Sequence, residues 1–201
     1  PEGLILLESI MNFSIQLAEE HHIPHIAAIT NLEAKRSTAT VSSSDEPIER
    51  WQNQYNQYRN FTPWLVALSQ RSDSEEVIGY AKAAPYNARG GFRWSVALSI
   101  YISEAYKGQK VGDALYTVLF DLLKRQGFIN VYARIALPNP GSQRLHQRFG
   151  LKQTGVLPKF AWKFETWHDM AIYTGTINKA MNSDPPPLLS VEEAWEERFN
   201  R

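Results

Sequence analysis

Apolar and polar residues alternate along residues 94–102, and the alternation stops abruptly after them. An apolar residue at every second position is the pattern of a β-strand. The apolar positions of this stretch are Trp94, Val96, Leu98, Ile100 and Ile102. Residues 103–110 break the pattern with small, polar and charged side chains. From Gly112 the apolar spacing becomes that of one helical face. The sequence therefore predicts a strand, a short loop and a long helix, which ends at Gly127.

The joint between this strand and this helix gives the first indication of function. The backbone N–H groups of a first helical turn lack partners inside the helix, and together with the helix dipole they favour a phosphate. A loop containing glycine delivers the chain to this helix start. We interpret the joint as a candidate site for an anion such as the diphosphate of a nucleotide-like cofactor. Most joints of this kind bind nothing, so the alternative is a purely structural turn.

The same patterns predict the remaining elements. Further strands are expected at residues 13–17, 64–69, 77–84, 128–136, 151–157 and 168–177. Helices are expected from Pro24 to about residue 32, at residues 48–58, from a cap at Ser142 to residue 149, and at residues 191–200. The aromatic segment FAWKFETW is expected to separate the last two strands.

This order of elements predicts a mixed α/β fold. A polar loop between the strands at 64–69 and 77–84 indicates an antiparallel hairpin, and the last two strands are expected to pair in the same way. The central strand–helix–strand unit implies one right-handed parallel crossover. A length of 201 residues suits one compact domain. We expect that domain at residues 12–180, an N-terminal extension at 1–11, and a proline-rich linker with a short helix at 181–201.

Composition narrows the classes of function. Lysine plus arginine and aspartate plus glutamate each number 21, so the net charge is zero and gives no support to nucleic-acid or membrane-surface binding. No apolar run is long enough to span a membrane. The opening GLILLESIM lacks the basic flank and the cleavage site of a signal peptide. The absence of cysteine excludes disulfides, thiolate metal sites and a cysteine nucleophile, and fits a reducing, cytoplasmic compartment.

Three histidines lie close together after the first strand, at His21, His22 and His25. Their spacing permits a metal site, but no known metal motif surrounds them. We expect a solvated loop and no metal.

Several segments together resemble the GNAT superfamily of N-acetyltransferases, and within it the phosphinothricin (methionine sulfone-type) acetyltransferase branch. In chain order they are PWLVA (63–67), ARGGFRW (88–94), IYIS (100–103), GDALY (112–116), QGFINV (126–131), LPNPGSQRLHQRFG (137–150) and TWHD (166–169). Each segment alone is weak, whereas their common order and spacing are specific. The resemblance covers about residues 12–178.

The resemblance implies a GNAT fold, in which a mostly antiparallel sheet flanked by helices contains a central parallel pair of strands that splays apart. It implies acetyl-CoA as the donor and no metal. The pantetheine amides would bond open backbone groups of the strand, and the diphosphate would sit on the loop and the helix start. The implied donor-site residues are Ile100, Tyr101, Ile102, Lys107, Gly108, Gln109, Lys110, Val111, Gly112, Asp113, Asn139 and Ser142.

The resemblance also implies an acceptor, namely the amine of a small amino acid or amino-acid analogue. His146 occupies a position at which it could protonate the leaving thiolate or relay a proton, and the alternative is a histidine packed beside the strand ends. The implied acceptor-site residues are Arg89, Gly90, Gly91, Phe92, Trp167 and His168. Exposed-loop or structural roles are the alternatives for Arg89 and Trp167. A homodimer is expected from the family alone.

Two departures from the family pattern matter. A lysine, Lys110, replaces the first glycine of the family's phosphate loop. Ala97 stands where relatives carry the glutamate that serves as general base, and alanine accepts no proton. Either the amine arrives deprotonated, or water, His146, His168 or Glu33 replaces the base. A non-catalytic acyl-CoA-binding module is therefore the alternative function, and an interaction protein that only shares the fold is a third.

Overall fold

The computed structural model describes residues 12–71, 75–179, 184–185 and 187–198. The expected N-terminal extension at residues 1–11 lies outside this range. Within these described residues, seven strands form one sheet in the order β1-β2-β3-β4-β5-β7-β6. The strands are β1 (Phe13–Leu17), β2 (Trp64–Ser69), β3 (Glu76–Pro85), β4 (Ser95–Ile102), β5 (Asn130–Ala136), β6 (Lys152–Lys163) and β7 (Thr166–Thr176). The helices are α2 (Ile23–Arg36), α3 (Ile48–Tyr58), α4 (Val111–Gln126), α5 (Pro140–Arg148) and α6 (Val191–Glu196).

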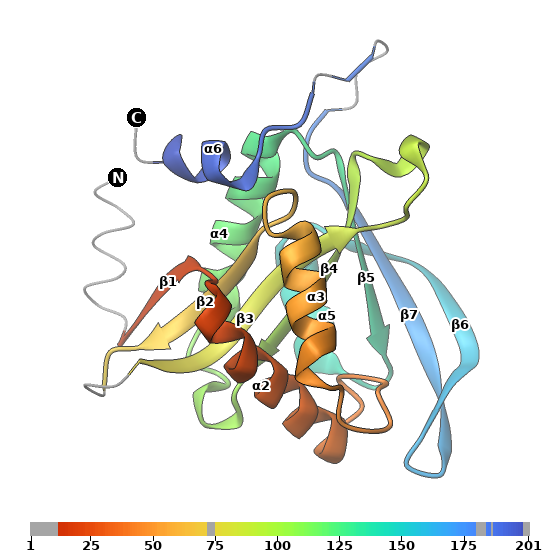
Figure 1. Cartoon of the computed structure of the whole chain (residues 1–201). Helices are drawn as coiled ribbons and strands as arrows, with labels where there is room; N and C mark the ends of the chain where they lie inside the picture. Colours follow the sequence, from red (N-terminus) through yellow and green to blue (C-terminus); the bar gives the residue numbers. More distant parts are fainter. Residues whose placement is uncertain (1–11, 72–74, 180–183, 186, 199–201) are drawn as a thin grey trace.

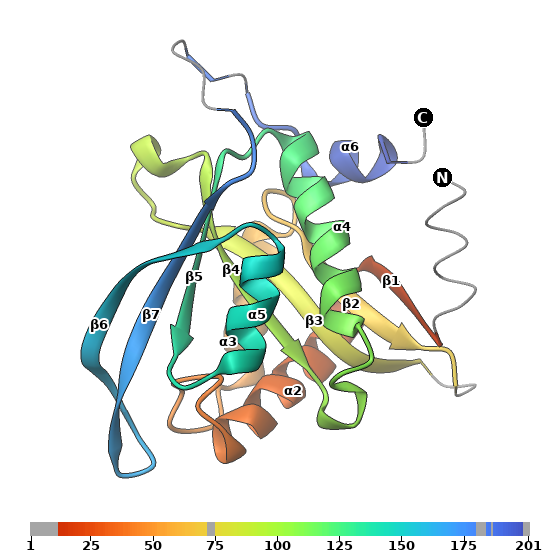
Figure 2. The same ribbon diagram turned by 180° about the vertical axis from the view of Figure 1, so that it is seen from behind.

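Helices cover both faces of the sheet. Figure 1 shows α2 and α3 in front of it, and Figure 2 shows α4 and α5 on the opposite side. The apolar stripe of α4 lies against the sheet, with Leu115, Leu119, Leu122 and Leu123 fully buried. Burying one leucine side chain stabilises a fold by about 1.5–3 kcal/mol, so this stripe is enough to fix α4 in place. A second cluster, which includes Trp51, Trp64 and Tyr80, joins α3 to the sheet.

The central strands separate, as the resemblance implies. Strands β4 and β5 are the parallel pair, and they are in register only at Ser95–Asn130, Val96–Val131 and Ala97–Tyr132. Beyond Ala97, β4 continues to Ile102 beside β3, and β5 continues to Ala136 beside β7. All other neighbouring strands are antiparallel. The mixed α/β, mostly antiparallel fold with a splayed parallel pair is confirmed.

The helices depart from the predicted boundaries at three points, one of which is α6, which ends at Glu196 and not at residue 200. Helix α2 continues to Arg36, four residues past the expected end, because Glu33 and Ala34 are buried and keep the chain helical. The cap of α5 is Asn139, whose Oδ1 accepts a hydrogen bond from the N–H of Ser142 at 3.1 Å. Ser142 itself is therefore inside the helix. The C-cap at Gly127 is confirmed, with φ at 94°.

The last hairpin is longer than predicted. Most of the aromatic segment belongs to β6 and β7, and the chain turns at Phe164 and Glu165, both of which have positive φ. Phe160, Trp162 and Trp167 are more than half exposed, whereas Lys163 is buried. The pairing of the last two strands was predicted, but their extension through the aromatic segment was not, because the apolar side chains there are exposed and the lysine is buried.

The expectation of a solvated histidine loop is wrong for His22, which is fully buried in a 3-10 turn at Glu20–His22. A residue far away in the chain takes part in this environment, since Glu75 accepts a hydrogen bond from the His22 Nε2 at 2.5 Å. His21 and His25 are exposed, as expected.

Candidate active site

The loop between β4 and α4 presents an open helix start. Lys110 is the N-cap residue of α4, it lies in the left-handed region at φ 63°, and its side chain makes no capping hydrogen bond. Gly108 is also left-handed, at φ 77°, a conformation that glycine adopts without cost. A non-glycine residue at positive φ is uncommon and often marks a functional turn. No side chain at the N-cap position therefore competes with a ligand for the first N–H groups of α4.

A cavity of about 530 Å³ lies at this helix start. All the donor-site residues named from the sequence line it, with the exception of Gln109. The Gln109 side chain instead donates to the Ala105 carbonyl at 2.7 Å and accepts from Arg71 at 3.5 Å. The structure thus brings the strand end, the loop, the helix start and the head of α5 together around one space.

Gly112 lines this cavity between Leu145 of α5 and Ile100 of β4. A Cβ atom built there would lie 3.4 Å from a methyl of Leu145 and 3.8 Å from a methyl of Ile100. Glycine therefore leaves the backbone of the first helical turn accessible between α5 and β4. The backbone N–H of this residue is one of those that a diphosphate would use.

Four basic residues and two acidic ones, Glu33 and Asp113, line the cavity. Lys107, Lys110, Arg144 and Arg148 all line it, and Arg148 pairs with Asp113 at 2.7 Å. Positive charge focused in a cleft attracts anionic ligands such as phosphates. The sequence reasoning missed Arg144 and Arg148. Their i,i+4 spacing on α5, next to Asn139 and Ser142, was the available signal.

Glu33, which lines the cavity, forms ion pairs with the basic residues Arg36 and Lys107. Lys107 Nζ lies 3.2 Å from Glu33 Oε1 and 2.8 Å from Glu104 Oε2, and Arg36 contacts both carboxylates. Burial acts to raise the pKa of Glu33, but hydrogen bonds from Ser37, Arg36 and Lys107 outweigh it and lower that pKa. Both oxygens are engaged. This carboxylate is a poor proton acceptor, and its role here is to hold Lys107 beside the loop.

His146 is buried between α4 and α5. Its Nδ1 donates to the Ser142 carbonyl at 2.8 Å, and its Nε2 accepts from the Tyr116 hydroxyl at 2.9 Å. Burial lowers the pKa of the ring, and the Ser142 carbonyl only partly opposes this. The ring is absent from the lining of the donor cavity. This geometry favours the packed-histidine alternative.

The acceptor-site residues fall in two places. Arg89, Gly90 and Gly91 are exposed in the loop before β4, and the Phe92 ring lies 5.2 Å from the Tyr86 ring. Phe92 and Tyr86 line a cavity of about 830 Å³ over the first residues of β4 and β5. Trp167 and His168 lie on β7 instead, where the His168 Nε2 donates to the Lys163 carbonyl at 2.9 Å. Neither Trp167 nor His168 lines the cavity that Phe92 lines.

Ala97 lies at the branch point of the sheet. It is the last β4 residue that is in register with β5, opposite Tyr132, and on its other side it pairs with Ala84 of β3. Any group that served as a base at this position would sit where the two strands part.

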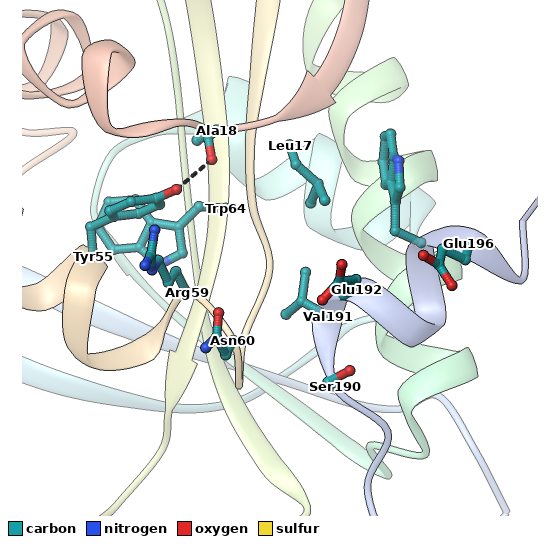
Figure 3. A pocket seen from close by; sticks show the side chains of 11 residues that line it. Leu17, Ala18, Tyr55, Arg59, Asn60, Trp64, Ser190, Val191, Glu192 and Glu196 are labelled. Carbon is teal, nitrogen blue, oxygen red and sulfur yellow. Dashed lines mark hydrogen bonds between the residues drawn. The ribbon is translucent and has the colours of Figure 1, made fainter.

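Two further features lie outside this region. A cavity of about 480 Å³ between α3, α6 and β2 contains none of the site residues named from the sequence (Figure 3). The Nε2 atoms of His21 and His22 both contact Glu75 Oε1, an arrangement that could hold a metal ion. However, the Nδ1 of His22 accepts from the Glu19 N–H at 2.8 Å, which places the proton of the neutral ring on Nε2. The contact is therefore a hydrogen bond.

Known proteins match this architecture. The family model for the acetyltransferase (GNAT) domain matches residues 15–172. The chain belongs to the GNAT acetyltransferase family. It is 32% identical over 169 residues to the phosphinothricin N-acetyltransferase of Streptomyces viridochromogenes, covering 84% of this chain and 88% of that enzyme. It is 35% identical over 111 residues to the Streptomyces coelicolor enzyme of the same name; that match spans 55% of this chain and 65% of that enzyme.

A solved structure agrees with the GNAT assignment. The crystal structure of a phosphinothricin acetyltransferase from Sinorhizobium meliloti in complex with acetyl-CoA superposes with a TM-score of 0.81 and 25% identity, covering 88% of this chain and 94% of that one. As a GNAT acetyltransferase, the chain uses acetyl-CoA as its donor. The residues present fit that donor, because an uncapped helix start, four basic side chains and the part of β4 that has left β5 line one cavity.

Proposed function

We propose that this GNAT acetyltransferase transfers the acetyl group of acetyl-CoA to the amine of a small amino acid or an amino-acid analogue of the phosphinothricin kind. The observation that carries this proposal is the separation of β4 from β5 next to the open start of α4. The diphosphate would accept hydrogen bonds from the N–H groups of residues 108–113. The pantetheine arm would pair with the free edge of β4 at residues 100–102, as an added strand does.

The reaction is a direct transfer. The acceptor nitrogen attacks the thioester carbonyl, the carbon–sulfur bond breaks, and the thiolate takes a proton to leave as coenzyme A. No acyl-enzyme on cysteine forms, because the chain contains no cysteine. Holding the two reactants in line can supply about 7–11 kcal/mol of barrier reduction in well-oriented cases. His146 acts as a positioning residue that fixes α5, and with it Asn139 and Ser142, against α4.

The acceptor contacts are part of the proposal. Arg89 pairs with an acidic group of the acceptor, since a guanidinium and a carboxylate or phosphinate make charge-assisted hydrogen bonds. Phe92, with the glycines before it, bounds the acceptor from the loop. Trp167 and His168 lie outside the cavity that Phe92 lines, and they provide a second set of acceptor contacts from the β6–β7 hairpin, beyond the pairing of Ala136 with Met170.

Assembly and location are inferred in the same way. The hairpin exposes Phe160, Trp162, Phe164 and Trp167, each more than half exposed, and a cluster of this kind marks an interaction surface. We infer that a second copy of the chain covers it in a homodimer. Among the helices that the structure describes, none has the length and apolar character needed to cross a bilayer. A cytoplasmic location rests on the absence of cysteine.

Release of free thiol from acetyl-CoA tests this function. The protein is incubated with acetyl-CoA and a panel of amino acids that includes phosphinothricin and methionine sulfone, and the acetylated product is identified by mass spectrometry. We expect amine-dependent thiol release with a matching N-acetyl product. Binding of acetyl-CoA without turnover on any amine would contradict the transferase function. It would support the alternative, a non-catalytic acyl-CoA-binding protein, for which Ala97 is the specific motivation.

A further inference from the structure

Lys82 carries a buried amine, and the acetyl transfer proposed above gives it no role. It lies on β3, opposite Trp64 of β2 and Ser99 of β4. Because alternate residues of a strand share a face, Lys82 is on the same side of the sheet as Ala84 and Ala97. It is therefore one strand away from the position at which the family's glutamate is missing.

The surroundings of this lysine are largely apolar. Its side chain is 7% exposed, and its Nζ lies 4.0 Å from the ring centre of Trp64 and 4.7 Å from that of Trp51. It donates a hydrogen bond to Gln54 Oε1, a neutral partner on α3. No ion pair found among the described residues includes Lys82. A buried ammonium group without a carboxylate partner loses its proton more readily than an exposed one.

The charged groups around Lys82 do not reverse this effect. Burial lowers the pKa of Lys82 to about 7, with Glu46 raising it and Arg50 lowering it by smaller amounts. Glu46 lies just before α3 and Arg50 lies in its first turn, whereas β2 and β4 present Trp64 and Ser99. Near neutral pH, a substantial fraction of the amine is therefore uncharged and able to accept a proton.

We propose that Lys82 is the general base that takes the proton from the acceptor's ammonium group, in place of the carboxylate that Ala97 lacks. This proposal rests on the proposed function. Neighbouring strands are about 4.8 Å apart, and a lysine amine moves on a flexible four-carbon stem. The residues between it and the branch point are small, namely Ala84, Ala97 and Ser99, and all three are only partly buried. The proposal requires the stem to turn from the tryptophans toward β4, along these small side chains and up to Tyr132, which lies opposite Ala97.

The proton steps balance. The ammonium group of the acceptor gives one proton to the Lys82 Nζ, which becomes an ammonium ion and frees the acceptor's lone pair. The resulting amine attacks the thioester, and the attacking nitrogen passes its second proton to the departing thiolate. Lys82 then releases its proton to solvent. In the protonated state, the faces of Trp51 and Trp64 stabilise the cation.

The test compares pH profiles of kcat/KM for the wild type, for Lys82→Met and for Lys82→Met combined with Ala97→Glu. Methionine keeps the unbranched stem and removes the base. We expect a wild-type rising limb near pH 7, a loss of about 10²–10⁴-fold in Lys82→Met, and a shift of its limb to higher pH. The added carboxylate should recover activity at least about tenfold, with the limb moved to acidic pH. The affinity for acetyl-CoA, measured by calorimetry, should stay unchanged in all three proteins.

The possible results distinguish a failure of the Lys82 proposal from a failure of the proposed acetyltransferase function. A wild type that acetylates no amine refutes the proposed function. If the wild type is active and Lys82→Met keeps both its rate and its pH profile, Lys82 is not the base. A loss of rate that Ala97→Glu does not recover, or that comes with weaker acetyl-CoA binding or a lower melting temperature, would show that Lys82 only supports the packing under α3.

Discussion

Filling the space at Gly112 should weaken donor binding without unfolding the protein. The structure leaves room for one methyl group, because a Cβ there would make ordinary contacts at 3.4 Å to Leu145 and 3.8 Å to Ile100. Gly112→Ala should therefore keep its affinity for acetyl-CoA, and it can gain up to about 1 kcal/mol of helix stability. In Gly112→Leu, the atoms beyond Cβ must enter the cavity that the diphosphate is expected to occupy.

The expected size follows from the hydrogen bonds that the leucine would block. A hydrogen bond to a charged group contributes about 1.5–3 kcal/mol. Losing one such bond raises the dissociation constant about 10- to 150-fold, at roughly 1.4 kcal/mol per factor of ten. Gly112→Leu should therefore bind acetyl-CoA at least tenfold more weakly than Gly112→Ala.

Isothermal titration calorimetry with acetyl-CoA measures this difference, and thermal unfolding controls for folding. Gly112→Ala is the matched control, since it changes the same residue without filling the cavity. If a folded Gly112→Leu protein bound acetyl-CoA as tightly as the wild type, the diphosphate would not lie on the first turn of α4.

Three further predictions concern stability. Tyr116→Phe leaves the buried Nε2 of His146 without its donor, so urea unfolding should show a loss of about 1–3 kcal/mol; an unchanged stability would contradict the assigned hydrogen bond. The pKa of His146 is lowered in the folded protein, so the unfolded chain binds its proton first as the pH falls. Below about pH 6.5, the unfolding free energy should therefore fall, by at most about 1.4 kcal/mol per pH unit from this group, and His146→Gln should show a shallower slope. Ser190→Ala removes the Oγ that accepts from the Glu193 N–H at the start of α6, which should cost about 1 kcal/mol and raise amide exchange in α6 before other helices.

The sequence predicts best where the pattern is local. The change from strand period to helix period around Gly112 identified β4, the loop and α4, and the donor-site residues lie there in one contiguous stretch. Asn139 and Ser142 join them through α5. The residues that the sequence missed at this site, Arg144 and Arg148, reach the cavity only because α5 packs beside the start of α4.

Contacts between segments far apart in the sequence explain the features that the sequence did not predict. Lys163 reads as a surface lysine, yet its Nζ donates to the carbonyls of Ser37 and Thr40, far away in the chain. In the sequence, Lys82 is a charged residue within an apolar strand. In the structure, its Nζ lies over the ring of Trp51, which belongs to α3. His22 is buried, and its Nε2 donates to Glu75, more than fifty residues away in the chain. The apolar pattern of a single segment does not predict these partners. It predicts which face of a helix or strand is buried, but not which distant segment packs against that face.

The most direct test of the account is a crystal structure of the protein with acetyl-CoA bound. The account predicts the diphosphate within hydrogen-bonding distance of the N–H groups of residues 108–113, and the pantetheine arm along β4 at residues 100–102, between the separated strands. Acetyl-CoA bound elsewhere, for example in the cavity between α3 and α6, would contradict it. So would strands β4 and β5 paired along their whole length, which would leave the donor no free strand edge.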